Sequence, residues 1–501
     1  MSSSIITSTN SSKNAEPIQV PNTTRRRSFL EYGGSNSLSN FASSYTRASK
    51  YAGSVLMEDE DNGENSGIIN YDNLSPCMSP DEELIIDNSM NRSSADETTT
   101  LISHHRKSSS FLITGNSTVP QTIFNTINTL MGIGMLSLPF AFKLSGWLFG
   151  SIILLVSSLS TNITAKYLGR ILFKNQNLLT YSDISYCYGG KYFQLLVTLF
   201  FISDLFGASL SLIILFSDSF SILYHNKTHL KFIITTVLCC CSFFPMSTLS
   251  LLSIWGILST IGIVILIFIC GINGVKSPGS LLNPASTNLY PSSFKNLLFS
   301  MGLYLVIYGG APVFPELYRD MRHPKKFSNC ANISFSIVTL LNFLIGASGY
   351  LMFGNDIDDS IIMNLMNNKS YPTWVSNTLF ILMGVISISK LPLVVRPIIT
   401  TYESIMKIKR NNVLKVITRV LFCILLLIIS LLFNSFGKLM SFMGSAICYT
   451  VCLTLPLLFY LKLNRNEIKK WKGLLIKVGI VISIVGTILG TYASITLKIT
   501  K

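Results

Sequence analysis

The amino-acid sequence predicts an all-α, polytopic membrane protein with about eleven membrane-spanning helices. First, 49% of the 501 residues are hydrophobic and only 13% are charged, and the mean hydropathy is +0.48. This composition excludes an ordinary soluble protein. Second, the apolar residues fall into runs of roughly 20 residues, which is the length a helix needs to cross a bilayer. Third, most charged residues of residues 112–501 lie in short connections between these runs.

We expect residues 112–501 to form one transmembrane domain. The fourth of its expected spans is the shortest. In chain order, the expected spans are residues 119–141, 145–169, 191–217, 230–246, 249–273, 294–317, 328–353, 372–402, 412–433, 436–461 and 472–496.

Residues 1–111 differ sharply in composition from the rest of the chain. They are rich in Ser, Thr and Asn and carry 9 Lys or Arg against 14 Asp or Glu. So few apolar residues cannot offset the entropy of ordering, and we expect a disordered cytosolic N-terminal tail. Ser28 follows three arginines, and Ser75 and Ser79 each precede a proline, so these serines are phosphorylation candidates for kinases.

The positive charges predict the orientation in the membrane. Connections on the side of the tail carry 19 Lys or Arg, and those on the other side carry 9. Because Lys and Arg stay on the cytosolic side, we expect a cytosolic N-terminus. Two sequons, at Asn226 and Asn368, then face the far side and are glycosylation candidates. Residues 112–501 carry a net charge of +20, which we attribute to topology and anionic lipid rather than to nucleic acid.

Two expected spans are interrupted by glycines in corresponding places. One contains Gly132-Ile133-Gly134, and the other contains Tyr308-Gly309-Gly310 followed by Ala311-Pro312. Lipid offers no partner for freed backbone groups, so irregular backbone is tolerated only against protein or a watery cavity. Paired broken helices indicate the substrate site of a transporter. The alternative is close helix packing through small residues.

Polar side chains precede the first interruption. Asn125, Asn128 and Thr129 lie on one side of the helix before the glycines, where amides and hydroxyls can bind an amino or carboxylate group. Exposed amides at Gly132–Gly134 suit the carboxylate of an amino acid. For Asn125 and Asn128, the alternative is hydrogen bonding between helices.

Three titratable residues are proton-coupling candidates. Asp204 lies near the middle of the third span, where a charged carboxylate costs roughly 2.5–3.5 kcal/mol. It is either a proton carrier or a structural carboxyl. Lys390, in the eighth span, either takes the place of a coupling cation or pairs with a carboxylate. Glu316, at the end of the sixth span, fits a gate or an ion pair with Arg319 or Arg322 better than the substrate site.

Several stretches together resemble the amino acid/auxin permease family, and within it the fungal vacuolar amino-acid transporters related to the vesicular inhibitory amino-acid transporter. The resemblance covers residues 120–495 and part of the tail. It rests on Phe124–Asn128, Gly132–Pro139, Ser145–Trp147, Val313–Pro324, Gly349–Gly354, Leu391–Pro397 and Pro456–Leu461, and on Arg26–Leu30 and Gly33–Ser37 in the tail.

The resemblance implies a LeuT-like fold of two inverted five-helix repeats plus one helix. It also implies proton-coupled amino-acid transport across the vacuolar membrane. The substrate site would use the first and sixth helices, here Asn128, Thr129, Gly132, Gly134 and Gly310. One departure is Ala311, where close relatives tend to carry a histidine, and this leaves the proton-carrying residue open.

We therefore expect a secondary active transporter of the vacuolar membrane that works by alternating access, with antiport into the vacuole. Its partners would be amino acids, protons, the lipid bilayer and kinases acting on the tail. We expect no cofactor, no metal and no nucleic acid. The alternatives are a sodium- or proton-coupled symporter at the plasma membrane and an amino-acid sensor with negligible flux. A membrane enzyme is disfavoured because His323 and a few carboxylates are its only catalytic candidates.

Overall fold

The structure is a computed structural model that describes residues 115, 117–175, 178–224, 226–243, 246–272, 279–368, 370–405, 412–433 and 435–497. The expected tail lies outside the described residues, and Ser28, Ser75 and Ser79 lie outside them with it. Within the described ranges the chain is helical, apart from connections and one isolated bridge between Ser117 and Met321.

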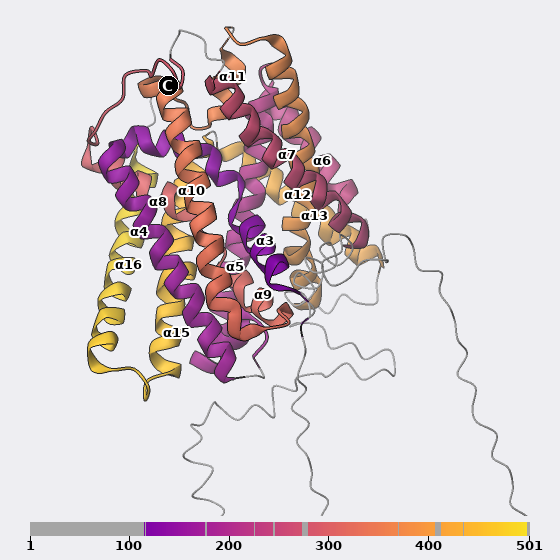
Figure 1. Cartoon of the computed structure of the whole chain (residues 1–501). Helices are drawn as coiled ribbons and strands as arrows, with labels where there is room; N and C mark the ends of the chain where they lie inside the picture. Colours follow the sequence, from indigo (N-terminus) through magenta and orange to yellow (C-terminus); the bar gives the residue numbers. More distant parts are fainter. Residues whose placement is uncertain are drawn as a thin grey trace, which may run out of the picture.

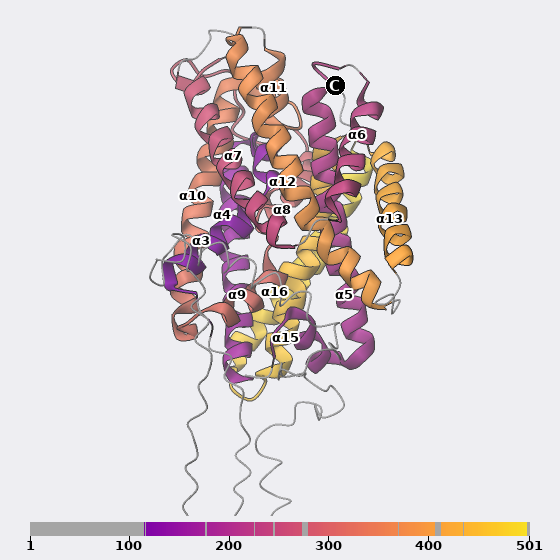
Figure 2. The ribbon, with the colours of Figure 1, turned by 90° about the vertical axis from the view of Figure 1, so that its right-hand side faces the viewer.

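Long helices lie side by side and form a single bundle (Figures 1 and 2). The α-helices are α3 (Val119–Leu130), α4 (Leu138–Lys174), α5 (Tyr181–Phe220), α6 (Lys227–Cys241), α7 (Met246–Ile272), α8 (Phe294–Val306), α9 (Phe314–Asp320), α10 (Phe327–Phe353), α11 (Ile361–Asn367), α12 (Thr373–Ile405), α13 (Asn412–Leu432), α14 (Phe436–Phe442), α15 (Leu455–Leu463) and α16 (Lys470–Thr496). Short 3₁₀ helices are η3 (Ile133–Ser137), η4 (Ala311–Val313), η5 (Pro324–Lys326) and η6 (Gly354–Asp356), and η7 (Met443–Thr454) is a π-helix.

Nine helical runs among the described residues are long and apolar enough to cross a membrane. This confirms the prediction of an all-α polytopic membrane protein, while the count of eleven stays a prediction. The second part of the expected span 119–141 joins the expected span 145–169 in one helical run, Ile133–Lys174, that turns at Gly146. The expected fourth span corresponds to α6, whose 15 residues are too few to count as a crossing.

Gly146 is required by the turn between the first two expected spans. Its φ is +71° and its ψ is 173°, a region that is essentially restricted to glycine. A Cβ there would lie 2.6 Å from the carbonyl oxygen of Leu289. The segment around Leu289 crosses this turn and accepts hydrogen bonds from the amides of Trp147 and Leu148, both at 3.2 Å.

The lower end of the bundle in Figure 1 joins the start of α3 to the end of α9. The amide of Ser117 donates to the carbonyl of Asp320 at 2.7 Å, and the Ser117 hydroxyl donates to the Asp320 carboxylate. Arg319 donates to three backbone carbonyls, those of Leu172, Asn175 and Leu178, at 2.7–2.9 Å. These contacts fix α3, α4 and α9 relative to one another.

The upper end carries α11 and the connections that precede α6 and α12 (Figure 2). Both sequons lie here, because α5 starts beside Arg319 at the lower end and finishes shortly before Asn226. The Asn226 side chain accepts from the amides of Thr228 and His229 and so caps α6. Asn368 follows α11 and accepts from the amide of Ser370 at 3.0 Å. Both sequons therefore lie at the same end of the bundle.

Helix α8 packs closely against η7 through two facing glycines. A Cβ on Gly444 would lie 1.9 Å from the Gly302 carbonyl oxygen, and one on Gly302 would lie 2.3 Å from the Ser441 carbonyl oxygen. Small residues let membrane helices approach in this way. The packing brings η7 beside the end of α8, where the second expected interruption falls.

Candidate functional site

The first expected interruption is present between α3 and η3. Helix α3 ends at Leu130, and Gly132 is extended, with φ −84° and ψ 178°. Its amide turns back to the carbonyl of Leu130 at 2.9 Å. The chain then resumes as η3, and no residue in the described part of the chain accepts a hydrogen bond from the amides of Ile133 and Gly134. Such free N–H groups at a helix start attract anions.

The second expected interruption is present between α8 and η4. Helix α8 ends at Val306, and the chain turns through Tyr308, Gly309 and Gly310 before η4 begins. The amide of Gly309 reaches only the carbonyl of Val306, at 3.2 Å, and the amide of Gly310 reaches that of Tyr308, at 2.8 Å. Pro312 cannot donate to the preceding turn, so a continuous α-helix is disfavoured here.

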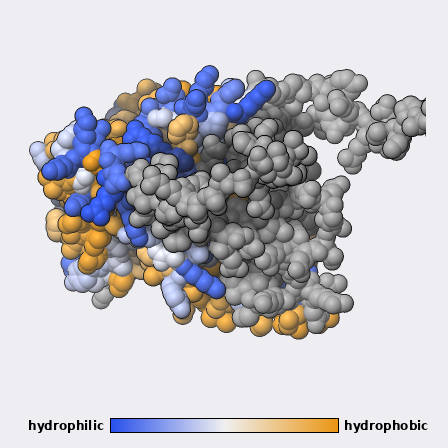
Figure 3. Space-filling view, turned by 90° about the horizontal axis from the view of Figure 1, so that it is seen from below, coloured by the Kyte–Doolittle hydropathy of each residue, from blue (hydrophilic) through white to orange (hydrophobic). Residues whose placement is uncertain are grey.

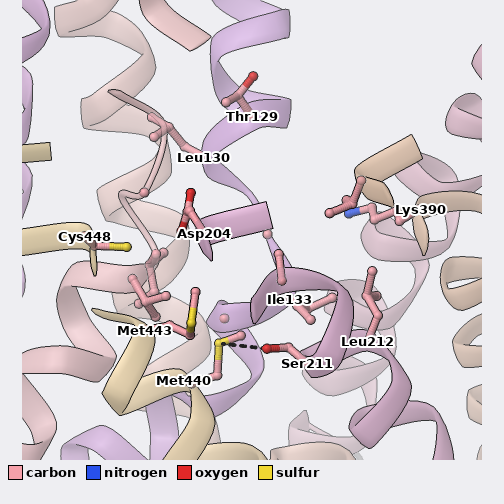
Figure 4. Close-up of a pocket in the computed structure, with 17 residues that line it drawn as sticks. Thr129, Leu130, Ile133, Asp204, Ser211, Leu212, Lys390, Met440, Met443 and Cys448 are labelled. Carbon is pink, nitrogen blue, oxygen red and sulfur yellow. Dashed lines mark hydrogen bonds between the residues drawn. The ribbon is translucent and has the colours of Figure 1, made fainter. Parts of the chain in front are cut away.

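The two interruptions meet at one cavity of about 210 Å³ (Figure 4). Its walls come from the interrupted helices and from α5, α12, α14 and η7. The lining residues are Thr129, Leu130, Gly132, Ile133, Gly134, Asp204, Ala208, Ser211, Leu212, Val306, Ile307, Gly309, Lys390, Val394, Met440, Met443 and Cys448. Segments far apart in the sequence thus surround a small space beside both breaks.

Gly132 leaves space rather than allowing close packing. A Cβ at this position would find no atom nearer than the Gly134 nitrogen, at 4.0 Å. Gly309 differs, because a Cβ there would lie 3.0 Å from the Val306 carbonyl oxygen and 3.1 Å from the Cys448 sulfur. The packing alternative therefore fits Gly309 and does not fit Gly132.

Two opposite charges face the cavity. Asp204 comes from α5 and Lys390 from α12, and Figure 4 shows them entering from different sides. No hydrogen bond or ion pair to either side chain is found among the described residues. The stem of Lys390 packs on α7, where a Cβ on Gly256 would lie 3.3 Å from the Lys390 Cγ. Both charges are thus available to whatever enters the cavity.

Several expected binding residues lie beside the cavity rather than in its wall. Tyr308 is fully buried, and its hydroxyl donates to the Thr339 hydroxyl at 3.1 Å, on α10. Gly310 packs against the side chains of Leu130 and Thr129. Asn128 is half-buried on the last turn of α3 and is absent from the lining. Asn125 is buried one turn earlier, and its carbonyl accepts from the Thr129 hydroxyl at 2.9 Å.

Glu316 lies away from the cavity, in α9 at the lower end. Its side chain is 5% exposed. The expected ion pair with Arg319 is not found within the described residues, because the Arg319 guanidinium is occupied by backbone carbonyls. The charge that acts on Glu316, that of Asp183 at the start of α5, has the same sign and does not replace the ion pair. Glu316 is thus a buried carboxyl near the lower end, apart from the cavity.

Four lining residues with polar or sulfur-containing side chains have no signal in the sequence that singles them out. Met440, Met443 and Cys448 come from α14 and η7, and Ser211 lies on α5 one turn beyond Gly207. The Ser211 hydroxyl donates to the Gly207 carbonyl at 2.8 Å. A π-helix such as η7 is rare and often marks functional sites, but no residue pattern in this chain predicts it.

Known amino acid transporters resemble this chain in sequence over most of its length. The family model described as "Transmembrane amino acid transporter protein" matches residues 115–496. Among curated proteins, the amino acid transporter AVT1J of Arabidopsis thaliana is 30% identical and the match covers 76% of this chain and 91% of that protein. The amino acid transporter AVT1C of the same plant is 27% identical over 77% of this chain and 71% of that protein. A solved manganese transporter of Eremococcus coleocola aligns with a TM-score of 0.46 at 12% identity, over 79% of this chain and 89% of the other.

The helical bundle with its central cavity is that of a multi-pass membrane transporter. The chain belongs to the transmembrane amino acid transporter family, which confirms the resemblance to the amino acid/auxin permeases. These relatives are transporters and not enzymes, as the sequence predicts.

Proposed function

We propose that this protein exchanges small neutral amino acids for protons across the vacuolar membrane, by alternating access around the central cavity. The observation that supports the proposal best is the cavity itself. It combines the unpaired amides of Ile133 and Gly134 with Asp204 and Lys390, beside two interrupted helices. Binding at the junction of broken helices is the arrangement of many secondary transporters.

Backbone groups of the protein hold the polar end of the substrate. Its carboxylate accepts hydrogen bonds from the amides of Ile133 and Gly134 at the positive start of η3. Its ammonium group faces the negative carbonyl end of α8, near Ile307. The substrate side chain lies against Met440 and Met443. Ligand pockets usually measure roughly 300–1,000 Å³, so a cavity of about 210 Å³ favours a small side chain.

Asp204 is the proton carrier in this proposal. It is the one carboxyl of the described lining, and that lining holds no histidine. A carboxyl that faces a cavity can take a proton from one side and release it to the other as access alternates. Lys390 supplies a fixed cation where sodium-coupled transporters hold an ion. An acidic vacuole would then drive amino acids inward as protons leave.

The same proposal includes the orientation in the membrane, the two repeats and the conformational change. The N-terminus is cytosolic, so the lower end with Arg319 faces the cytosol. Helices α3 to α7 form one inverted repeat, α8 to α15 form the other, and α16 is the additional helix. The interrupted helices rock against the rest of the bundle, and the contact between Ser117 and Asp320 at the lower end opens and closes.

Reconstitution in liposomes tests the proposal. Full-length protein is given an imposed pH gradient, acidic inside, and a panel of labelled amino acids, with protein-free liposomes as the control. We expect uptake that requires the gradient and does not change when potassium replaces sodium. Uptake that follows sodium would indicate a symporter, and saturable binding without flux would indicate a sensor. Either result would reject proton exchange.

A further inference from the structure

A second cavity lies at the lower end and takes no part in the proposed transport. It measures about 500 Å³ and lies between α4, α10 and α15. Its lining is rich in cations, with a single carboxylate among the described residues. The charged members are Lys166, Arg170, Lys174, Lys325 and Glu467. Figure 3 shows hydrophilic residues gathered at this end of the molecule, beside apolar ones.

Most of these cations are not neutralised within the described part of the chain. Lys166, Arg170 and Lys174 follow one another at four-residue intervals and so share one face of α4. Among the described ion pairs, Lys174 alone of these three is paired, with Glu467 at 3.0 Å. Like charges at this spacing destabilise a helix by about 0.2–0.5 kcal/mol per pair in isolation. An anionic ligand would remove that repulsion.

The cavity lies at the level where the apolar outer surface ends. On α4 the run of exposed apolar side chains ends at Ile163, one turn before the cations begin, and only Phe173 follows among the cations. On α10 they begin at Ile333, after the cavity residue Ser328, and on α16 they begin at Leu474. Exposed Trp471 stands at the same boundary, which aromatic residues prefer. The cavity therefore opens where lipid headgroups meet water.

Other groups in the cavity suit a headgroup that carries hydroxyls as well as phosphate. Arg170 lies over the Tyr167 ring, 5.7 Å from its centre, and reaches the Tyr460 hydroxyl at 3.4 Å. Asn464 is 6% exposed and interacts with Glu467, which leaves its side-chain oxygen buried without a partner in the described residues. Asn464 therefore places a polar side chain with an unsatisfied acceptor in the cavity wall.

We propose that this cavity binds the headgroup of an anionic, hydroxyl-bearing phospholipid of the phosphatidylinositol phosphate type, with a phosphate group between Lys166 and Arg170. Basic pockets between membrane helices bind such headgroups. The exposed ring of Phe173, at the rim, contacts the start of the acyl chains. In the proposed orientation, the lipid belongs to the cytosolic leaflet and links α4 to α15.

The test measures binding and does not depend on transport. Full-length protein in neutral detergent is titrated with a short-chain phosphatidylinositol phosphate that carries a fluorophore on one acyl chain, and its anisotropy is recorded. We expect saturable binding that weakens at least about tenfold in the Lys166→Gln/Arg170→Gln variant. The matched control is Lys469→Gln/Lys470→Gln, which removes two exposed cations outside the cavity and should bind within about twofold of the wild type. Size-exclusion profiles confirm that each variant is folded.

Glu467→Gln gives an independent readout in the opposite direction. Because it removes the one carboxylate of the described lining and releases Lys174, we expect binding at least about threefold tighter. Unchanged affinity in this variant would overturn the proposal. So would equal weakening in both double variants, or displacement of the probe by phosphatidylcholine. Displacement by millimolar inorganic phosphate would assign the site to free phosphate, and displacement by a synthetic peptide of residues 56–66 would assign it to the acidic tail. Both outcomes reject the lipid.

Discussion

Gly132→Ala separates a ligand-binding role for this glycine from a structural one. The backbone at Gly132 is extended, a conformation that alanine adopts without strain. A Cβ would meet nothing closer than 4.0 Å, so the protein should fold and insert normally. The new methyl group enters the space that the substrate occupies. We therefore expect an effect on transport without an effect on stability.

The size of the effect follows from the size of the cavity. In a cavity of about 210 Å³, a methyl group occupies a substantial part of the space beside the amides of Ile133 and Gly134. A misfit of one methylene group in an apolar pocket costs about 1–3 kcal/mol, or roughly 10–200-fold. We expect kcat/KM for the largest accepted amino acid to fall by at least about tenfold, with a smaller loss for the smallest substrate. Gly132→Leu should abolish uptake.

The assay compares initial uptake rates in liposomes for several amino acids of increasing size. Gly473→Ala is the matched control, because its Cβ would meet only the Ile468 side chain at 3.7 Å, far from the cavity in sequence and structure. Melting temperatures of both variants should stay close to that of the wild type. Equal kcat/KM in Gly132→Ala and Gly473→Ala would refute the placement of the substrate at the first interruption.

Two further predictions concern the fold and the lower end. Gly146→Ala should destabilise the protein by more than about 2 kcal/mol, because φ +71° and the Leu289 carbonyl oxygen at 2.6 Å both exclude a Cβ. The loss of stability should be measured as a lower melting temperature in detergent, and an unchanged melting temperature would contradict this. The hydrogen bond from Lys174 holds the pKa of Glu467 below its ordinary value. This pair is therefore intact above the ordinary carboxyl pKa and is lost as pH falls through the lowered value. As pH falls through this range, the lipid affinities of the wild type and of Glu467→Gln should become equal. A difference in affinity that stays constant with pH would argue against the pair.

The architecture was largely predictable from the sequence because bilayer thickness imposes it. Apolar runs of about 20 residues have few alternatives to a spanning helix, and the glycine and proline residues at both interruptions act locally. The join at Gly146 was not predictable, because it depends on the Leu289 segment that crosses it. Nor was the length of α6, since the apolar run of the sequence continues past the end of the helix at Cys241 into Phe243 and Phe244.

The site was predictable in part. Asp204 and Lys390 stand out because charges are costly within apolar spans, but only the packing of α5 against α12 brings them to one cavity. Tyr308 was expected in the wall because it borders the glycines. Its hydroxyl needs a partner in an apolar interior and finds one in Thr339, which turns the ring away. The direction of a side chain within an irregular turn has no signature in the sequence.

The central cavity holds one acid, Asp204, and one base, Lys390, and this pair determines the net charge that each transport cycle moves. With Asp204 and Lys390 both ionised, the two charges cancel, and a zwitterionic substrate leaves that balance unchanged. The net charge moved in each cycle is then that of the proton alone. We predict electrogenic transport, with a current in the direction of proton movement when substrate is added to proteoliposomes on a solid-supported electrode. In Asp204→Asn the current should vanish, while exchange of labelled for unlabelled amino acid persists. A current of unchanged size in that variant would mean that the proton travels through another group, and Glu316 would be the next to replace.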